Sequence, residues 1–300
     1  MSGIPFVPGE DDPGAGNGTA PRAIAEAQLP STQDEPLTRV AALGAIYSNH
    51  QALRMAIDDA RERGAQAVIC LGDLGAFGPS PDKSARILRE EGIPVVRGNY
   101  DDSIARGLED CQCGYTDPRD NHYARISYEY TLANTSAEHR EWMSGFPRQI
   151  RFQMGEGPEA LQVLAFHGSP RRMNEFLWET TTPTHFLQAM ADEADADLLL
   201  GTHTGIHWSR RLGRGRWYVN AGALGRPAND GRREVWYTLL ELDRGRLNPH
   251  FVPVSYDVEA LADEMLDEGL PEEFIETIRT GWWTTCLEVL PGKERARGRW

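Results

Sequence analysis

The chain has 300 residues and a mass of 33.5 kDa, which allows one large domain or two ordinary ones. Hydrophobic residues make up 40% and charged residues 25% of the sequence, a balance that excludes collagen, a coiled coil and wholesale disorder. The 45 acidic residues outnumber the 31 basic ones and give a formal net charge of −14. We therefore expect the molecule to repel nucleic acids and anionic membranes.

No apolar stretch reaches the roughly 20 residues that a membrane-spanning helix needs. The first residues, MSGIPFVPGEDD, lack the basic and apolar segments of a signal peptide. The sequence thus predicts a cytoplasmic protein that has neither a membrane nor a nucleic acid as its partner.

Residues 1–37 differ in composition from the rest of the chain. Eleven of these 37 residues are Gly or Pro, six are acidic and one is Arg. They show no hydrophobic periodicity, which is typical of segments that cannot bury enough apolar surface to fold. The pattern predicts a flexible N-terminal arm.

From residue 38 onward, apolar strands alternate with amphipathic helices, which predicts a βαβ unit with a buried parallel sheet. The strands expected in this half cover residues 39–46, 67–73 and 93–99. The helices cover residues 49–63 and 84–90, with a short third one between a capping box at residues 135–138 and Pro147.

Several strands follow one another directly in the second half, which adds antiparallel pairing to the α/β plan. They are expected over residues 161–167, 196–201, 216–222, 234–242 and 250–256. A helical stretch and the basic tail KERARGRW close the chain, and Pro271 begins a second helix within that stretch. We infer one domain over residues 38–255 with a lid insert at about 105–130, and a helical extension with its tail over 256–300, packed on the same domain.

Polar side chains follow four of the expected strands where each one ends. Ligands of α/β sheets bind beyond the carboxyl ends of the strands, so these positions are candidates for function. Nearby glycines allow the sharp turns that aim the side chains inward. The set comprises one carboxylate, one amide and two imidazoles, namely Asp73, Asn99, His167 and His203. Such oxygen and nitrogen donors suit a divalent first-row metal ion.

Five sequence blocks resemble, in the same order, those of the calcineurin-like metallophosphoesterases, the family of bacterial phosphodiesterases and protein phosphatases with a two-metal centre. The blocks are ICLGDLGAFGPSP, VVRGNYD, AFHGSP, LLLGTHTGIHW and YVNAGALGRP, and the resemblance spans residues 38–279. It implies a four-layer α/β/β/α sandwich, in which two mixed β-sheets pack face to face, helices flank them, and the metal ions lie at one edge.

The chain departs from this family at the first metal ion. The family has Asp-x-His and then Gly-Asn where this sequence reads AIYSN at residues 45–49, and Gly205 replaces the second His of the late Gly-His-x-His block. The resemblance implies that the second metal ion keeps all its ligands, which are Asp73, Asn99, His167 and His203. We therefore predict one divalent or trivalent transition-metal ion, with Mn, Fe, Zn and Co as the candidates.

Three hypotheses for the function follow. The first is a metallophosphoesterase-like hydrolase with a single-metal centre that acts on a small phosphorylated or anionic metabolite. The second is a catalytically inactive protein that binds a metal ion or a ligand, because the family normally stabilises the attacking and leaving oxygens with two ions. The third is a mononuclear enzyme, with iron as one candidate, that performs chemistry other than phosphate-ester hydrolysis.

Three side chains are candidates for catalysis beside these ligands. Tyr47 occupies the position of a lost ligand, where its phenol would bond a substrate oxygen, ligate a ferric ion or fill the vacated space. Tyr100 follows Asn99 where family phosphatases carry a His that protonates the leaving group, although a phenol with a pKa near 10 is a weaker acid. Arg226 lies on a Gly-Arg-Pro loop and would clamp a phosphate or carboxylate, or pair with an acidic residue.

Several other residues leave alternatives open. His50 and His207 would either rebuild the lost metal site or serve as capping and surface groups. Cys111 and Cys113, in the predicted lid insert, would form a zinc site or, as we favour, remain reduced thiols in a substrate loop. The tryptophans at 282–283 would cover a subunit interface, cover the pocket mouth or pack in the core, and a homo-oligomer is left open.

Overall fold

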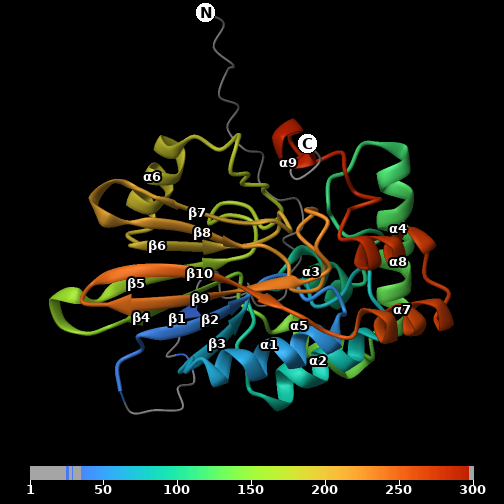
Figure 1. The fold of residues 1–300 in the computed structure, drawn as a ribbon, viewed down its shortest axis with the longest axis horizontal. Coiled ribbons are helices and arrows are strands. Elements are labelled where there is room, and N and C mark those ends of the chain that lie inside the picture. Colours follow the sequence, from blue (N-terminus) through green and yellow to red (C-terminus); the bar gives the residue numbers. More distant parts are fainter. Residues whose placement is uncertain (1–24, 27–28, 30–34, 297–300) are drawn as a thin grey trace, which may run out of the picture.

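Two β-sheets pack face to face at the centre of the molecule, and helices lie outside them (Figure 1). The computed structural model describes residues 25–26, 29 and 35–296. The predicted α/β/β/α fold, with two mixed sheets flanked by helices, is confirmed.

The four-stranded sheet has the order β10-β9-β2-β3. In it, β2 (Arg39–Leu43) lies parallel to β3 (Ala67–Cys70) and antiparallel to β9 (Val235–Asp243), whose other neighbour is β10 (Arg246–Val254). Every residue of β3 is buried, and so is every residue of β2 after the first. Burial on both faces explains why these two strands are continuous apolar runs in the sequence.

The six-stranded sheet has the order β1-β4-β5-β6-β8-β7. Its centre is parallel, from β5 through β6 to β8, whereas β4 and β7 each pair antiparallel with their inner neighbour. The strands are β1 (Ala25–Glu26), β4 (Gln149–Met154), β5 (Leu161–Phe166), β6 (Leu198–Gly201), β7 (His207–Arg211) and β8 (Trp217–Ala221).

Helices cover the outer faces of both sheets and one end of the sandwich. In Figure 1, α1 and α2 lie along the four-stranded sheet, α6 lies outside the six-stranded sheet, and α4, α7 and α8 gather at one end. The helices are α1 (His50–Glu62), α2 (Pro81–Glu90), α3 (Asn99–Arg106), α4 (Pro118–Asn134), α5 (Ala137–Ser144), α6 (Thr184–Glu193), α7 (Val258–Asp267), α8 (Glu272–Thr280) and α9 (Gly292–Ala296).

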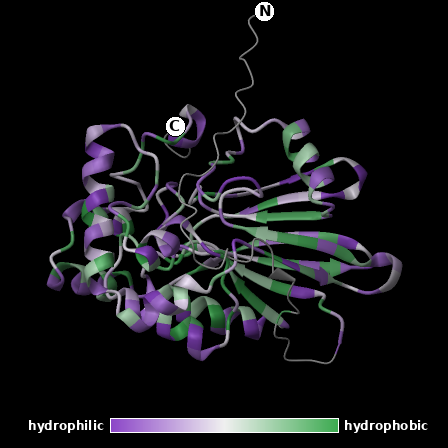
Figure 2. Ribbon diagram, turned by 180° about the vertical axis from the view of Figure 1, so that it is seen from behind, coloured by the Kyte–Doolittle hydropathy of each residue, from purple (hydrophilic) through white to green (hydrophobic). Residues whose placement is uncertain are grey.

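Apolar side chains fill the space between these layers. Between the two sheets, Val40 and Ile69 belong to one buried cluster with Val163 and Leu198, and Figure 2 shows the strands as the most hydrophobic part of the ribbon. On the other side of the four-stranded sheet, α1 buries a stripe that includes Leu53. Each fully buried side chain of this size contributes roughly 1.5–3 kcal/mol, so the sandwich is a rigid base for the loops at its edge.

The structure differs from the predicted elements in several places, and α3, α4 and α6 were not among the predicted helices. The strand predicted over residues 93–99 is wrong, because only an isolated bridge joins Cys70 and Val95 there before α3 begins. The sequence did not predict β4 or β7, whose exposed positions are polar. The short helix α5 is present, but Ser136 rather than Thr135 caps it, since the Ser136 side chain accepts a hydrogen bond from the backbone of His139.

Part of the predicted arm has a defined position. β1 and the buried Leu29 come from it, whereas residues 1–24, 27–28 and 30–34 of the arm, and 297–300 of the basic tail, lie outside the described residues. The boundaries of the domain, the lid insert and the extension stay predictions. In the described part of the chain, no helix is both long and apolar enough to cross a membrane.

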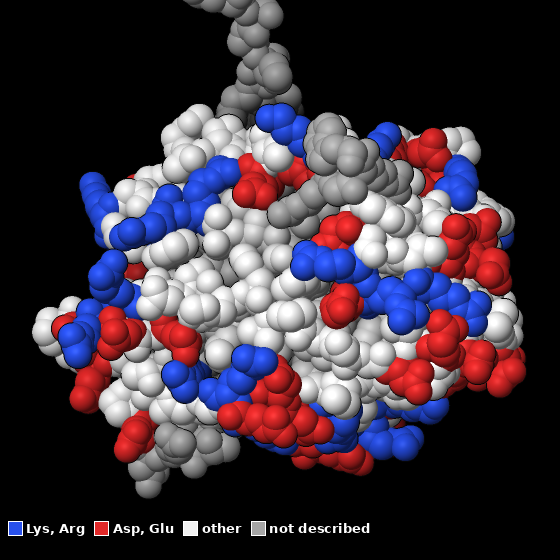
Figure 3. Space-filling model, in the orientation of Figure 1, with Lys and Arg blue, Asp and Glu red and all other residues white. Residues whose placement is uncertain are grey.

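Charged side chains of both signs are distributed over the surface. On the face shown in Figure 3, basic and acidic side chains surround a central region that is mainly uncharged. Basic side chains are therefore present on this face, although the chain as a whole carries a net charge of −14.

Candidate metal centre

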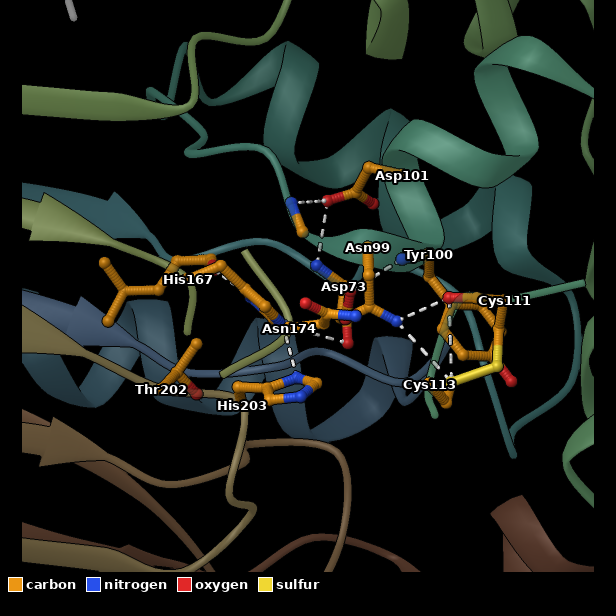
Figure 4. Close-up of polar contacts among 12 residues, drawn as sticks. Asp73, Asn99, Tyr100, Asp101, Cys111, Cys113, His167, Asn174, Thr202 and His203 are labelled. Atoms are coloured by element: carbon orange, nitrogen blue, oxygen red, sulfur yellow. Dashed lines mark hydrogen bonds and ion pairs between the residues drawn. A yellow bond between two sulfur atoms is a disulfide. The ribbon is translucent and has the colours of Figure 1, made fainter. Parts of the chain in front are cut away.

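The four predicted ligands meet at one edge of the two sheets (Figure 4). Asp73 follows β3, His167 follows β5, His203 follows β6, and Asn99 is the first residue of α3. One ligand atom from each of Asp73, His167 and His203 lies within 4.8 Å of the other two, and all three residues are buried. The carboxyl ends of parallel strands thus bring together residues that are up to 130 positions apart in the sequence (73 to 203).

His167 is at the centre of this group. Its Nε2 atom lies 3.2 Å from Asp73 Oδ2 and 3.1 Å from His203 Nδ1. Its Nδ1 atom donates a hydrogen bond of 2.7 Å to the Leu71 carbonyl. Because a carbonyl only accepts, this bond places a proton on Nδ1, and the other ring nitrogen, Nε2, faces the group. Such a bond to a carbonyl is the usual way in which proteins orient a metal-binding His.

Two buried polar atoms at the site have no hydrogen-bond partner among the described residues. They are Asn99 Oδ1 and His203 Nε2. The amide nitrogen of Asn99 is engaged, since it donates to the Cys111 carbonyl over 2.8 Å, so its oxygen is the atom left over. An unpaired buried acceptor costs about 1–3 kcal/mol, and a bound cation would remove that cost. The residues present therefore fit a metal ion.

The protonation states of His203 and Asp73 also suit metal binding. At His167, burial lowers the pKa, but the charge and the hydrogen bond of Asp73 raise it above the ordinary value, so a metal ion would compete with a proton at this ring. Burial and the neighbouring His167 lower the pKa of His203 to about 3, so this ring is neutral at pH 7. Burial alone would raise the pKa of Asp73, but the two imidazoles hold it below its ordinary value, so the carboxylate is ionised. A neutral imidazole and an ionised carboxylate are the forms that bind a metal ion.

The backbone around the ligands adopts conformations that few side chains tolerate. Asp73 has a φ of 55° and His203 a φ of 70°, both in the left-handed region. Such conformations cost of order 1–3 kcal/mol each and tend to occur at functional sites. The Asp73 carboxylate is held by the Tyr100 backbone, whose N–H donates to Oδ1 over 3.0 Å.

Asp101 supports the same turn and was not among the predicted site residues. Its carboxylate accepts hydrogen bonds of 2.8 Å from the backbone of Asp73, 2.8 Å from Gly98 and 3.0 Å from Leu74. Burial and the charge of Asp73 raise the pKa of Asp101 to about 6. The sequence signal is its position three residues after Gly98, where a side chain can return to the start of α3.

The two predicted tyrosines have different surroundings. The Tyr100 ring is buried, and its hydroxyl donates to Ser127 Oγ over 3.0 Å, so its backbone is the part that touches Asp73. Tyr47 is also buried, with a φ of 46°, and packs edge-on against Phe77. Burial and the charge of Asp73 raise the pKa of Tyr47, whereas the charge of Arg226 opposes the shift. The Tyr47 phenol is therefore neutral, and the charges of both Asp73 and Arg226 act on it.

Arg226 is 5% exposed and has no carboxylate within ion-pair distance among the described residues. Its guanidinium lies 4.5 Å from the ring of Phe77 and 4.2 Å from that of Trp283, and Nη2 donates to the Thr285 carbonyl over 2.8 Å. Burial lowers its pKa from the ordinary value. A buried cation without a counter-charge is costly, which is a reason to expect an anion there.

A small cavity adjoins both of these side chains. It measures about 10 Å³, enough for one water molecule, and Tyr47, Phe77, Arg226 and apolar residues of α7 and α8 line it. The C-terminal extension therefore forms one wall of the space beside Arg226.

The structure places the two alternative histidines away from the metal centre. His50 Nε2 lies 2.8 Å from Glu264 Oε2 in α7. The His207 ring packs between those of Trp236 and Phe251, with centroids 4.6 Å away in each case. Neither imidazole reaches the group formed by the predicted ligands.

The interpretation of Cys111 and Cys113 as reduced thiols or a zinc site is wrong, because a disulfide joins them. Gln112 between them has a φ of 54°, which turns the backbone so that the two side chains meet on one side. The loop lies beside the metal centre, since Asn99 Nδ2 is 2.8 Å from the Cys111 carbonyl and 3.5 Å from Cys113 Sγ (Figure 4).

The sequence profile of the calcineurin-like phosphoesterase superfamily domain matches residues 39–245, more than half of the chain. The chain belongs to this superfamily. Phosphoesterases of this superfamily depend on metal ions and act on phosphorylated substrates, so the geometry and the family both indicate a metal-binding site at this edge.

The similarity to three relatives extends over almost the whole length of each relative. An uncharacterized protein of Methanocaldococcus jannaschii, MJ0912, is 23% identical over 256 residues, or 81% of this chain and 98% of the relative. The fold is similar to that of a metallophosphoesterase from Sphaerobacter thermophilus, with 23% identity, a TM-score of 0.60, and 81% and 99% of the two chains covered. It is also similar to the hypothetical protein PH1004 of Pyrococcus horikoshii, with 23% identity, a TM-score of 0.67, and 82% and 99% covered.

Proposed function

We propose that the protein is a metal-dependent phosphoesterase-like hydrolase with a single metal ion, held by Asp73, Asn99, His167 and His203. The observation that carries the proposal is the convergence of three buried ligand atoms within 4.8 Å, beside the unpaired Asn99 Oδ1 and His203 Nε2. The substrate is a small phosphorylated or otherwise anionic metabolite, for which the buried Arg226 supplies a positive charge.

The chemistry that such an ion supplies when bound is Lewis acidity and a lower pKa of water, and Mn, Fe, Zn and Co suit this donor set. The chain contributes the rest. Arg226 binds and orients the anionic group of the substrate. Tyr47, neutral because burial raises its pKa, donates a hydrogen bond to a substrate oxygen, and Tyr100 holds Asp73 in position through its backbone N–H.

The test is the metal content per chain by elemental analysis, for the wild type and for His203→Ala. We expect about one equivalent in the wild type, at least tenfold weaker metal binding in the variant, and hydrolysis of an aryl phosphate that is lost in His167→Ala. His185→Ala is the control, because His185 is an exposed residue of α6 and should keep both metal and activity. Two equivalents, or none, in the wild type would contradict the single-metal centre.

A ligand-binding protein without turnover is the second candidate. The observation that favours it is the hydrogen bond between Tyr100 and Ser127, which occupies the hydroxyl that would serve as the acid for the leaving group. Tight binding of inorganic phosphate to the metal-loaded wild type, with no hydrolysis of aryl phosphates, would support this candidate over the hydrolase. Oxygen-dependent colour with bound iron would instead indicate other mononuclear chemistry.

A further inference from the structure

The segment between α8 and α9, residues 281–290, lies against the candidate site, and we call it the C-terminal strap. In Figure 1 it is the red chain that leads from α8 toward α9. Its residues Trp283, Thr285, Cys286 and Leu290 are at most 5% exposed although the segment has no regular secondary structure. A buried irregular segment needs specific hydrogen-bond partners for its backbone.

The strap touches Arg226 in two ways. The Thr285 carbonyl accepts the 2.8 Å hydrogen bond from Arg226 Nη2, and the Trp283 ring lies 4.2 Å from the guanidinium carbon. Trp283 is itself fixed, since its backbone N–H donates to Asn229 Oδ1 over 2.9 Å and its indole N–H to the Pro227 carbonyl over 2.6 Å. The strap therefore sets which edge of the guanidinium remains for an anion.

The strap also packs against the loop that carries His203. A Cβ atom on Gly205 would lie 2.8 Å from the Trp283 ring, so the two segments are in close contact. Trp283 belongs to a buried apolar cluster against which Phe176 packs, and the Phe176 ring centroid lies 4.2 Å from that of His203, with the two rings tilted by 32°. One wall of packed rings thus connects Arg226 with a metal ligand.

Asp120 holds the strap in place from α4. Its Oδ1 accepts a 2.7 Å hydrogen bond from the backbone N–H of Cys286, and its Oδ2 accepts one of 2.7 Å from the backbone N–H of Glu288. Asp120 is 4% exposed, and no Lys, Arg or His lies within ion-pair distance of it in the described part of the chain. The Asp120 carboxylate therefore bonds the strap backbone directly. One of its partners, Cys286, has a φ of 59°, in the left-handed region.

We propose that Asp120 is a positioning residue, which fixes the C-terminal strap against Arg226 and so orients the guanidinium that would bind an oxyanion, a phosphate or a carboxylate, beside the metal centre. This inference rests on the proposed function, because Arg226 is the group with which the hydrolase would hold its anionic substrate. The substitution Asp120→Asn would keep one acceptor oxygen. It would turn the amide NH₂ group toward the other strap N–H, and so would break one of the two hydrogen bonds from the strap backbone.

The test compares Asp120→Asn with Asp58→Asn. Asp58 is an exposed residue of α1, and no hydrogen bond or ion pair joins it to the strap among the described residues, so this control changes the charge by the same amount without touching the strap. Inorganic phosphate is titrated calorimetrically into the metal-loaded proteins. We expect Asp120→Asn to bind phosphate roughly tenfold more weakly, with the KM for an aryl phosphate raised by a similar factor, kcat within about twofold and the metal content unchanged. The control should match the wild type.

Equal phosphate affinity in both variants would overturn the inference, and so would a wild type that binds metal but no phosphate. Hydrogen exchange of the wild type keeps the test valid if Asp120→Asn fails to fold. Phosphate should slow exchange of the amides at residues 283–288 at least severalfold, and unchanged exchange would also refute the inference. A wild type that binds phosphate without metal or turnover would overturn the proposed function alone.

Discussion

Gly98 shows how closely the site residues pack. A Cβ atom added to it would lie 2.2 Å from Asp73 Oδ1 and 2.5 Å from the Asp73 backbone nitrogen. Its φ of −91° is ordinary, so the backbone conformation does not require glycine here. The lack of space requires glycine here, because Asp73 can keep its position beside α3 only when residue 98 has no side chain.

We predict that Gly98→Ala displaces the Asp73 carboxylate and weakens metal binding by at least tenfold, with a loss of stability of about 1–3 kcal/mol from overpacking. Elemental analysis and thermal denaturation measure the two effects. Gly145→Ala is the matched control, since Gly145 also has a negative φ and its added Cβ would meet its nearest atom at 3.4 Å. Full metal content in Gly98→Ala would refute this account of the packing.

The sequence was informative about the ligand positions and uninformative about what supports them. The four candidate ligands could be predicted because each one follows an apolar run of the sequence and lies within two residues of a glycine. Asp101 and Asp120 act on the backbone of other segments, and the bond from Cys286 to Asp120 spans 166 positions. No local pattern encodes such a partner, so these contacts became visible only in the folded chain.

At the scale of the elements, Glu264 fixes the C-terminal extension to the domain. This residue of α7 accepts hydrogen bonds from Lys83 Nζ over 2.6 Å, Ser80 Oγ over 2.7 Å and the His50 ring over 2.8 Å. Burial alone would raise the pKa of Glu264, but these donors lower it from 4.5 to about 2. One carboxylate thus connects α7 with the beginnings of α1 and α2.

We predict that Glu264→Gln lowers the free energy of unfolding at pH 7 by about 1–2 kcal/mol. Because the folded-state pKa lies below the unfolded value, the stabilisation is complete above about pH 4.5 and is lost as the pH falls toward 2. Urea denaturation at several pH values should show the difference between wild type and variant shrinking over this range. Glu268→Gln, which removes a single exposed bond to Tyr130, should cost only a few tenths of a kcal/mol at any pH. A pH-independent difference for Glu264→Gln would contradict the assignment.

The elements with strong periodicity were the ones that could be predicted. The unit of β2, α1 and β3 matches its predicted position, because its strands are buried on both faces and Asn49 caps the helix. The strand predicted over residues 93–99 has apolar residues but forms only one bridge. Conversely, β7 reads HWSRR and gains its strand conformation from pairing with β8, a tertiary effect that local propensity does not contain.

At the scale of the whole molecule, the two buried free cysteines can distinguish local opening of the strap from global unfolding. Cys70 lies in β3, where every residue is buried, and Cys286 lies in the C-terminal strap. We predict that a thiol reagent modifies Cys286 through local opening of the strap, whereas Cys70 reacts only through global unfolding. Mass spectrometry after timed labelling in increasing urea separates the two, and phosphate should slow the reaction of Cys286 alone. Equal rates at both thiols would mean that the strap opens only when the whole protein unfolds.

The position of the strap after α8 in the sequence has a consequence for biosynthesis. All four candidate ligands and Arg226 leave the ribosome before β9, which pairs with β2, and before β10, which completes the four-stranded sheet. The strap follows only after α7 and α8. A nascent chain can therefore bring its metal ligands together before the strap covers Arg226, and a chain that ends at residue 280 would lack both the carbonyl and the ring that contact this guanidinium.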